Sequence, residues 1–386
     1  MTVLFEKRPK TGVVSVAIAT KYGGIYERPE ERGIAHLIEH MLYKGTLKRN
    51  SKQISEEIEK KGGVMNAFTS EEITALWCKM PSKYLDTALD VLSDMIKNSI
   101  FDEKELEKER KVIFEEMKMW KDSPQLYISY KIRECLYKGI LSLNLIGTEK
   151  SLKSITKQKI LKRYEEAYST NNLILCVVGD ADFNNICKFA EDNFEKSKYI
   201  LPKPKIILQN KKVLERRKGI DQANLILAYH VPEATKKLHY SAQVLSSLMA
   251  GGMSSRLFQE IREKRNLAYV VKSSCNCDKD YGYDAVFIGT TKKNIRKVIR
   301  LILKEFEKIK NLNEKELKEI KEQLIGNNKI NKEDSQGQVL ELLYSEVFGN
   351  AKESYEYEKN IRNVKLSDVK KIADFKKYSI FALIPQ

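Results

Sequence analysis

The chain has 386 residues, of which 42% are hydrophobic and 32% charged, with a formal net charge of +16. This length exceeds one ordinary core and predicts two domains of roughly 190 residues each. The composition excludes a disordered, collagen-like or disulfide-scaffolded protein. There is no apolar run of about 18 residues, and MTVLFEKRPK at the start lacks the apolar core of a signal peptide. We therefore expect a cytoplasmic protein with no membrane span.

Most of the positive charge falls in the second half, because residues 201–386 carry a net charge of +13. A basic surface can bind nucleic acid or an anionic surface. Here the cations lie on helical patterns such as 292-KKNIRKVIRLILKEF-306, and no zinc-finger, KH or RNP signature accompanies them. The pattern favours a solvated, lysine-rich surface, and we expect no specific nucleic-acid partner.

Six cysteines are scattered along the chain, several of them in apolar runs such as 173-LILCVV-178. This usage is typical of buried free thiols in a reducing compartment. The sequence CNC at 275–277 lacks a second cysteine pair that would complete a metal site, so we expect no metal there.

The first half alternates between strand and helix patterns. In chain order it predicts a strand at 13–20, a charged glycine-rich loop at 22–33, a helix from about Ile34 to Tyr43, an amphipathic helix at 51–62, a strand or hairpin at 64–80, and helices at about 82–98 and 102–121. The segments 125–137 and 155–168 follow without an assigned structure and lead to a strand at 172–179. Ser51 is expected to cap the helix at 51–62. The strands do not strictly alternate with helices, which predicts an α+β fold with a mixed or antiparallel sheet and helices mainly on one face.

The second half repeats this order after a proline- and lysine-rich stretch. The strand pattern 223–230 corresponds to 13–20, and the patterns at 239–252, 254–266, 268–290 and 291–310 correspond to the later elements of the first half. A duplication predicts two tandem homologous domains. We place an N-terminal domain at 1–198, a linker and entering strand at 199–218, and a C-terminal domain at 219–386.

One short segment concentrates the histidines, since GIAHLIEHMLYKGT at 33–46 holds two of the four in the chain. Residues four apart on a helix share a face, so His36 and His40 can present two imidazoles to one ion, with Glu39 on the adjoining edge. A catalytic zinc needs a third protein ligand, which must come from elsewhere. From the motif alone, a zinc site and a helix with two hydrogen-bonded histidines both remain open. The second half has no counterpart of this motif.

A helix pattern further along the chain adds carboxylates on a partly apolar stripe. In 102-DEKELEKERKVIFEEMKMWKD-122, Glu109 and Glu116 share one helix face with Val112 and Ile113. A carboxylate on a buried helix edge is unfavourable unless it is paired or bound to a metal. A solvated acidic face is the interpretation for Glu103, Glu105 and Glu107 of this helix.

Four separated blocks then give the chain a wider resemblance. In order, they are HLIEHMLYKGT at 36–46, NAFTSEE at 66–72, ERKVIFEE at 109–116 and SSRLFQEIREKRNLAY at 254–269. With these blocks the chain resembles the inverzincin peptidases of the pitrilysin and mitochondrial processing peptidase family, in their short form of about 400 residues. The resemblance covers nearly the whole sequence.

The resemblance implies a zinc site and its surroundings. The ligands of one Zn²⁺ per chain would be His36, His40 and Glu116. Glu39 would be the general base, and Glu109 would be the carboxylate that orients a ligand histidine.

The resemblance also implies residues that contact substrate. Asn66 and Ala67 would lie on a strand that pairs with the extended substrate backbone, and Tyr43 would line the pocket before the scissile bond. Arg262 and Tyr269 would polarise the substrate carbonyl and stabilise the oxyanion. A surface arginine and a core tyrosine remain the alternative for that last pair.

Together these features predict a zinc-dependent endopeptidase that cleaves peptides or unfolded polypeptide segments. The family resemblance implies a chamber formed by two such chains, as a homodimer or as a heterodimer with a related chain. The alternative is a non-catalytic partner or scaffold subunit of a processing-peptidase-like complex.

Overall fold

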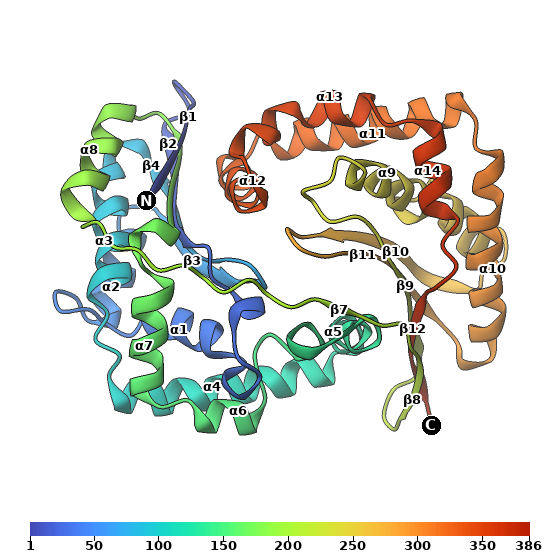
Figure 1. Ribbon diagram of the computed structural model, residues 1–386, viewed down its shortest axis with the longest axis horizontal. Helices are drawn as coiled ribbons and strands as arrows, with labels where there is room; N and C mark the ends of the chain where they lie inside the picture. The colour runs from blue at the N-terminus through green and yellow to red at the C-terminus, as the bar shows by residue number, and fades with distance from the viewer. The chain divides into compact units, whose positions relative to one another are not determined.

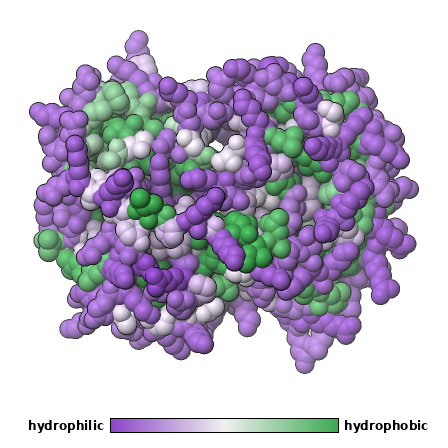
Figure 2. Space-filling view, in the orientation of Figure 1, coloured by the Kyte–Doolittle hydropathy of each residue, from purple (hydrophilic) through white to green (hydrophobic).

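The computed structural model describes residues 1–386, which form two compact units (Figure 1). Unit 1 comprises Met1–Met117, Leu143–Pro204 and Ile330–Ser354, and unit 2 comprises Lys118–Ser142, Lys205–Lys329 and Tyr355–Gln386. One of the crossings from unit 1 to unit 2, after Pro204, lies within the predicted linker at 199–218. Both units are discontinuous in sequence. None of the helices is long and apolar enough to cross a membrane. The face shown in Figure 2 is largely hydrophilic, with apolar residues in separate groups.

Unit 1 is built on a five-stranded sheet in the order β1–β6–β2–β4–β3. Its strands are β1 (Thr2–Lys7), β2 (Val13–Thr20), β3 (Val64–Thr69), β4 (Thr74–Pro81) and β6 (Leu173–Gly179). β1 runs parallel to β6, and the other neighbours are antiparallel. β3 ends the sheet, so its outer edge offers unpaired backbone groups.

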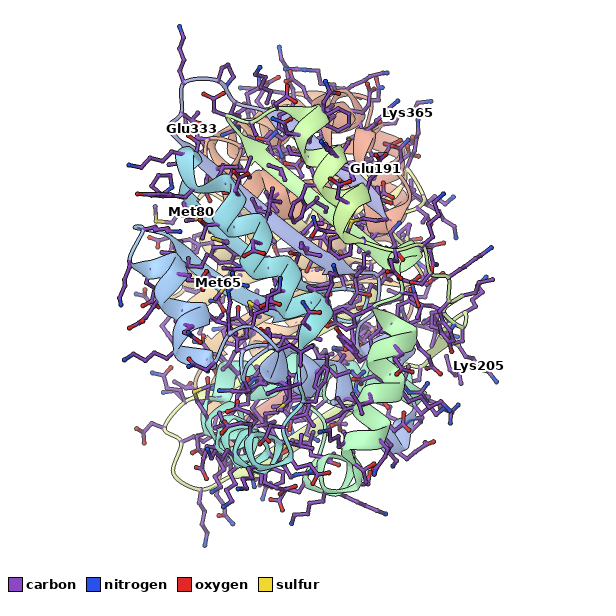
Figure 3. All side chains as sticks on the ribbon, turned by 90° about the vertical axis from the view of Figure 1, so that its left-hand side faces the viewer. Met65, Met80, Glu191, Lys205, Glu333 and Lys365 are labelled. Atoms are coloured by element: carbon purple, nitrogen blue, oxygen red, sulfur yellow. The ribbon has the colours of Figure 1, made fainter.

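The helices of unit 1 cover mainly one face of this sheet. They are α1 (Ile34–Leu42), α2 (Ser51–Glu59), α3 (Leu85–Asn98), α4 (Glu103–Asp122, which continues into unit 2), α6 (Glu149–Ser154), α7 (Lys157–Ala167) and α8 (Phe183–Asn193). Figure 3 shows this side, with Met65 and Met80 of the hairpin labelled beside α3. The prediction that Ser51 caps α2 is wrong. Asn50 is the cap, because its side chain accepts from Gln53 N–H while the Gln53 side chain accepts from Asn50 N–H.

Unit 2 repeats the same topology, with strand order β8–β12–β9–β11–β10. Its strands are β8 (Lys212–Arg217), β9 (Ala223–His230), β10 (Ala268–Cys277), β11 (Gly282–Thr290) and β12 (Ser379–Pro385), and a separate pair joins β5 (Tyr137–Lys138) to β7 (Ile207–Leu208). As in unit 1, one edge pair is parallel, here β8 with β12, and the other neighbouring strands are antiparallel. The predicted α+β fold of two homologous repeats is confirmed.

The helices of unit 2 are α5 (Pro124–Leu136), α9 (His239–Ala250), α10 (Ile295–Glu307), α11 (Glu314–Asn331), α13 (Tyr357–Arg362) and α14 (Leu366–Ala373). The regular helix expected over 254–266 is instead a π-helical segment at Phe258–Glu263. Its wider turn is visible in the hydrogen bond from Lys264 N–H to the Gln259 carbonyl, five residues earlier.

A helix from the other half of the sequence covers the second face of each sheet. α12 (Ser335–Phe348) packs on unit 1, where Val339, Leu342 and Leu343 join a buried cluster with residues of β2 and β6. α5 lies against β9 and β12 of unit 2, where Ser379 Oγ donates to the Cys135 carbonyl at 3.0 Å. Each core therefore needs residues from both halves of the chain.

This arrangement predicts that α12 stabilises the core of unit 1. Leu343 is fully buried, so Leu343→Ala should lower the free energy of unfolding by about 2–5 kcal/mol, measured by urea denaturation. Ile330→Ala is the control, because Ile330 is 67% exposed and its truncation should change stability by less than about 0.5 kcal/mol. Equal, small effects of both substitutions would contradict the role given to α12.

Candidate metal centre

Two imidazoles on α1 and one carboxylate on α4 converge within unit 1. The ring centroids of His36 and His40 are 4.6 Å apart. Glu116 Oε2 is 3.6 Å from His36 Nε2 and 3.9 Å from His40 Nε2. One ligand atom from each residue lies within 4.8 Å of the others. The structure thus brings together the three side chains predicted as zinc ligands, although the carboxylate comes from a distant helix.

The spacing and protonation of this group suit a zinc ion. Four-coordinate zinc holds nitrogen and oxygen ligands at about 2.0–2.2 Å, so neighbouring ligand atoms lie about 3.4 Å apart. The separations from Glu116 exceed this by only a few tenths of an ångström. Burial, with a contribution from His40, lowers the pKa of His36 to about 3. A neutral imidazole is the form that binds a metal, so the donor set fits zinc.

A buried carboxylate stands behind one of the two imidazoles. Glu109 Oε2 is 3.0 Å from His40 Nδ1, and Glu109 Oε1 is 2.8 Å from Lys44 Nζ. A carboxylate that holds Nδ1–H leaves Nε2 available to an ion, which is the position the resemblance assigns to Glu109. Lys44 supplies the opposite charge that a buried carboxylate needs, and the sequence analysis did not identify it. His36 Nδ1, by contrast, is buried without a hydrogen-bond partner.

Glu39 is tied to the edge strand of the sheet. Its Oε2 accepts a hydrogen bond from Thr69 Oγ1 at 2.5 Å. Burial raises the pKa of Glu39, and the hydrogen bond from Thr69 opposes that shift. A carboxyl group with a raised pKa is a stronger base than a free glutamate. Since Thr69 is the last residue of β3, the predicted base on α1 is connected directly to the strand predicted to pair with substrate.

Three of the five residues expected to contact substrate also lie in unit 1. Asn66 and Ala67 are on β3, and Asn66 Oδ1 accepts from the Ala67 N–H at 2.8 Å. A peptide carbonyl that bonds this N–H must displace the Asn66 side chain. The Tyr43 hydroxyl is buried without a hydrogen-bond partner, and burial followed by the nearby Glu39 charge raises the pKa of Tyr43.

Arg262 and Tyr269 belong to unit 2 and have exposed side chains. Arg262 lies in the π-helical segment with its guanidinium 4.8 Å from the Phe258 ring centroid. Tyr269 is 43% exposed on β10, and its ring crosses Gly289 so closely that a Cβ there would lie 2.5 Å from ring atoms. Because residue 289 is glycine, the Tyr269 ring can pack directly on the backbone of the sheet there. Tyr269 is not the buried strand tyrosine that was the alternative in the sequence analysis.

A buried ionic cluster holds the first turn of α1. Glu27 accepts from the backbone N–H groups of Gly33 at 3.1 Å and Ala35 at 2.8 Å, at the positive end of the helix dipole. Arg32, only 1% exposed, lies 3.1 Å from Glu27 and 2.7 Å from Glu71. Burial raises the pKa of Glu27 to about 7 against the opposing effects of Arg32 and the two N–H groups. The sequence analysis described this segment only as a charged loop.

Comparisons with known proteins identify the family of this chain. Residues 2–149 match the family model described as insulinase (peptidase family M16), and residues 154–324 match the peptidase M16 inactive domain. An uncharacterized zinc protease of Rickettsia felis is 37% identical over 85% of this chain and 80% of its own length. The chain belongs to peptidase family M16.

Other M16 relatives extend the match. The uncharacterized zinc protease YmxG of Bacillus subtilis is 32% identical over 84% of this chain and 80% of its own. The crystal structure of a protease from Helicobacter pylori superposes with a TM-score of 0.92 at 25% identity, over 99% of this chain and 96% of that one. The His-Glu-His motif of this M16 chain falls in the insulinase match. The half without the motif matches the domain described as inactive, so the family resemblance inferred from the sequence is confirmed.

The ionic cluster at the first turn of α1 yields a stability prediction. In Glu27→Gln, the side-chain amide faces the backbone N–H donors of Gly33 and Ala35. The buried Arg32 guanidinium also loses one of its two carboxylate partners. The substitution should lower the free energy of unfolding by about 3 kcal/mol. Chemical denaturation measures the change. Glu30→Gln is the matched control, because Glu30 is exposed in the same segment and should stay within about 0.5 kcal/mol of the parent. A Glu27→Gln protein as stable as this control would contradict the role of the cluster.

Proposed function

We propose that this M16 chain is a zinc-dependent endopeptidase that hydrolyses peptides or unfolded polypeptide segments. The observation that carries the proposal is the convergence of His36 Nε2, His40 Nε2 and the Glu116 carboxylate within 4.8 Å. When bound, zinc supplies a Lewis acid that polarises the scissile carbonyl and lowers the pKa of a water molecule.

A residue of the chain itself, Glu39, would transfer the proton. Glu39 takes a proton from the attacking water and later gives it to the leaving amine. Its raised pKa suits both steps. A carboxylate that stays ionised under all conditions would never hold the proton that it has to deliver. Thr69 fixes the orientation of the Glu39 carboxylate through the 2.5 Å hydrogen bond.

Two contacts would keep the ligand His40 in place. Glu109 fixes the ring of His40 from behind, and Lys44 balances the charge of that carboxylate. Because both partners are fixed, the imidazole does not have to reorient when an ion arrives. The buried ionic cluster of Glu27 and Arg32 holds the first turn of the helix that carries the motif.

Substrate would add to the free edge of β3 as an extended strand, at Asn66 and Ala67, with Tyr43 next to the Glu39 side. Arg262 and Tyr269, whose side chains are exposed in unit 2, would polarise the substrate carbonyl and stabilise the developing oxyanion. We further propose a dimer, either of this chain or with a related one, that encloses the substrate, and a cytoplasmic location. The family resemblance supports the dimer, and the six free cysteines support the location.

The central test compares metal content with hydrolysis of a quenched peptide. Glu39→Gln should keep stoichiometric zinc while kcat falls by about 10²–10⁴-fold, because only the proton carrier is lost. His40→Ala should lose both zinc and hydrolysis. Metal is measured by mass spectrometry of the purified protein, and a chelator should abolish parent activity.

Two outcomes would contradict the proposal. A Glu39→Gln protein that hydrolyses peptide at the parent rate would remove Glu39 from the chemistry. A well-folded parent chain that binds no zinc would favour the non-catalytic scaffold instead.

The contact between Thr69 and Glu39 gives a finer prediction. Thr69→Val preserves the shape of the side chain but removes the hydroxyl, so kcat/KM should fall about 10-fold or more, as for a lost hydrogen bond to a charged group of roughly 1.5 kcal/mol. Thr69→Ser keeps the hydroxyl and should retain most activity. Steady-state kinetics on one peptide measures both. An equal loss in the two variants would show that shape, and not the hydrogen bond, matters at this position.

A further inference from the structure

Two cysteines of unit 2 touch each other on an edge strand. Cys275 and Cys277 lie two residues apart on β10, and their Sγ atoms are 3.4 Å apart. Both are free thiols and half-buried. Neighbouring side chains on the same side of the strand point toward α9, where Ser273 Oγ donates to the Ser246 carbonyl at 2.7 Å. The two thiols are thus held against a packed helix but keep a route to solvent.

The other cysteines differ from this pair. Three of them (Cys78, Cys135 and Cys176) are buried singly, and Cys187 is half-buried without a second thiol in contact. The zinc site of unit 1 uses no sulfur, so the proposed hydrolysis gives the pair no role. Two thiols in van der Waals contact have a chemistry that a single buried thiol lacks, which is closure of a disulfide by exchange.

We propose that Cys275 and Cys277 form a thiol–disulfide exchange site that reacts with low-molecular-weight disulfides such as oxidised glutathione. The Cys277 thiolate attacks one sulfur of the small disulfide, whose S–S bond breaks and releases one thiolate. Cys275 then loses its proton to solvent and attacks the Cys277 sulfur, which expels the second thiolate. The net reaction oxidises two protein thiols to one intrastrand disulfide and reduces the small disulfide to two thiols.

The order of the two attacks follows from the surroundings of each sulfur. The hydrogen bond with Cys277, followed by burial, raises the pKa of Cys275 well above its usual value. Asp284, which pairs with Cys275 across β10 and β11, adds to that shift. Its carboxylate accepts from Tyr229 Oη at 2.8 Å and Ser246 Oγ at 2.9 Å. Cys275 is therefore slow to ionise, which leaves the first attack to Cys277.

The position of β10 in the sheet makes closure feasible. Residues two apart on an extended strand have Cα atoms about 6.7 Å apart, near the upper limit of about 6.8 Å for a disulfide. The strand must therefore pucker slightly between the two cysteines. β10 has a neighbour on one side only, and Cys277 with Gly282 is the last pair of its ladder. A pucker there disturbs few hydrogen bonds.

The same pucker would reach a pocket on the other side of the strand. Asn276, between the two cysteines, lines a pocket of about 290 Å³ together with Ser274 and Lys272 of β10 and residues of α5. Closure of the disulfide would therefore change one wall of this pocket.

The test uses the full chain equilibrated with glutathione buffers of increasing oxidised fraction, then alkylated and digested with trypsin. Cleavage after Lys272 and Lys279 yields the peptide SSCNCDK, residues 273–279, which contains both cysteines and no others. Mass spectrometry should find this peptide unalkylated and lacking two hydrogens in the oxidising buffers. Dithiothreitol should restore the fully alkylated form. Cys187 is the internal control, because it can gain glutathione but has no partner for closure.

Two variants separate the roles of the thiols. Cys275→Ser should accumulate the mixed disulfide on Cys277, and Cys277→Ser should form no intrastrand disulfide in any buffer. A parent peptide that carries two alkylated thiols in every buffer would overturn the proposal, as would a mixed disulfide that accumulates without closure. The parent measurement stands even if a variant folds poorly, and none of these readouts depends on peptidase activity.

Discussion

The constraint that shapes unit 1 is that two imidazoles and a carboxylate must meet at one point. The imidazoles come from one helix and the carboxylate from another, so the relative position of α1 and α4 determines whether a site exists. Three buried interactions fix that position. Glu109 joins α4 to His40, the cluster of Glu27 and Arg32 fixes the start of α1, and Thr69 links the helix to the edge strand. An error of about 1 Å in any of them would move a ligand atom out of reach.

The parts of the site that were predictable from sequence are those with a local pattern. His36 and His40 share a helix face because of their spacing alone, and Glu116 followed from a motif at a known distance along the chain. Lys44, Thr69 and the Glu27–Arg32–Glu71 cluster had no such pattern. Each depends on a contact between segments whose separation in sequence carries no periodic signal, so only the folded chain shows it.

The fold also has parts that were predictable from the sequence and parts that were not. Alternating hydrophobic residues predicted the strands of both repeats, and the duplicated order predicted their common topology. The second-face helices α5 and α12 were not predicted as helices, and no sequence feature told which sheet they cover. An amphipathic face specifies that a helix is buried and does not specify its partner. The π-helical segment at Phe258–Glu263 was missed for a related reason, since its residues have the composition of an ordinary helix.

The exchange of α5 and α12 between the repeats also affects how the protein is made. During synthesis the strands of the first sheet emerge early, but the helix that covers their second face is among the last segments to leave the ribosome. Until then an apolar surface of alanine, isoleucine and valine side chains stays open to solvent, where it can bind a chaperone or another nascent chain. The core of unit 1 therefore cannot be complete before the C-terminal part of the chain has been synthesised.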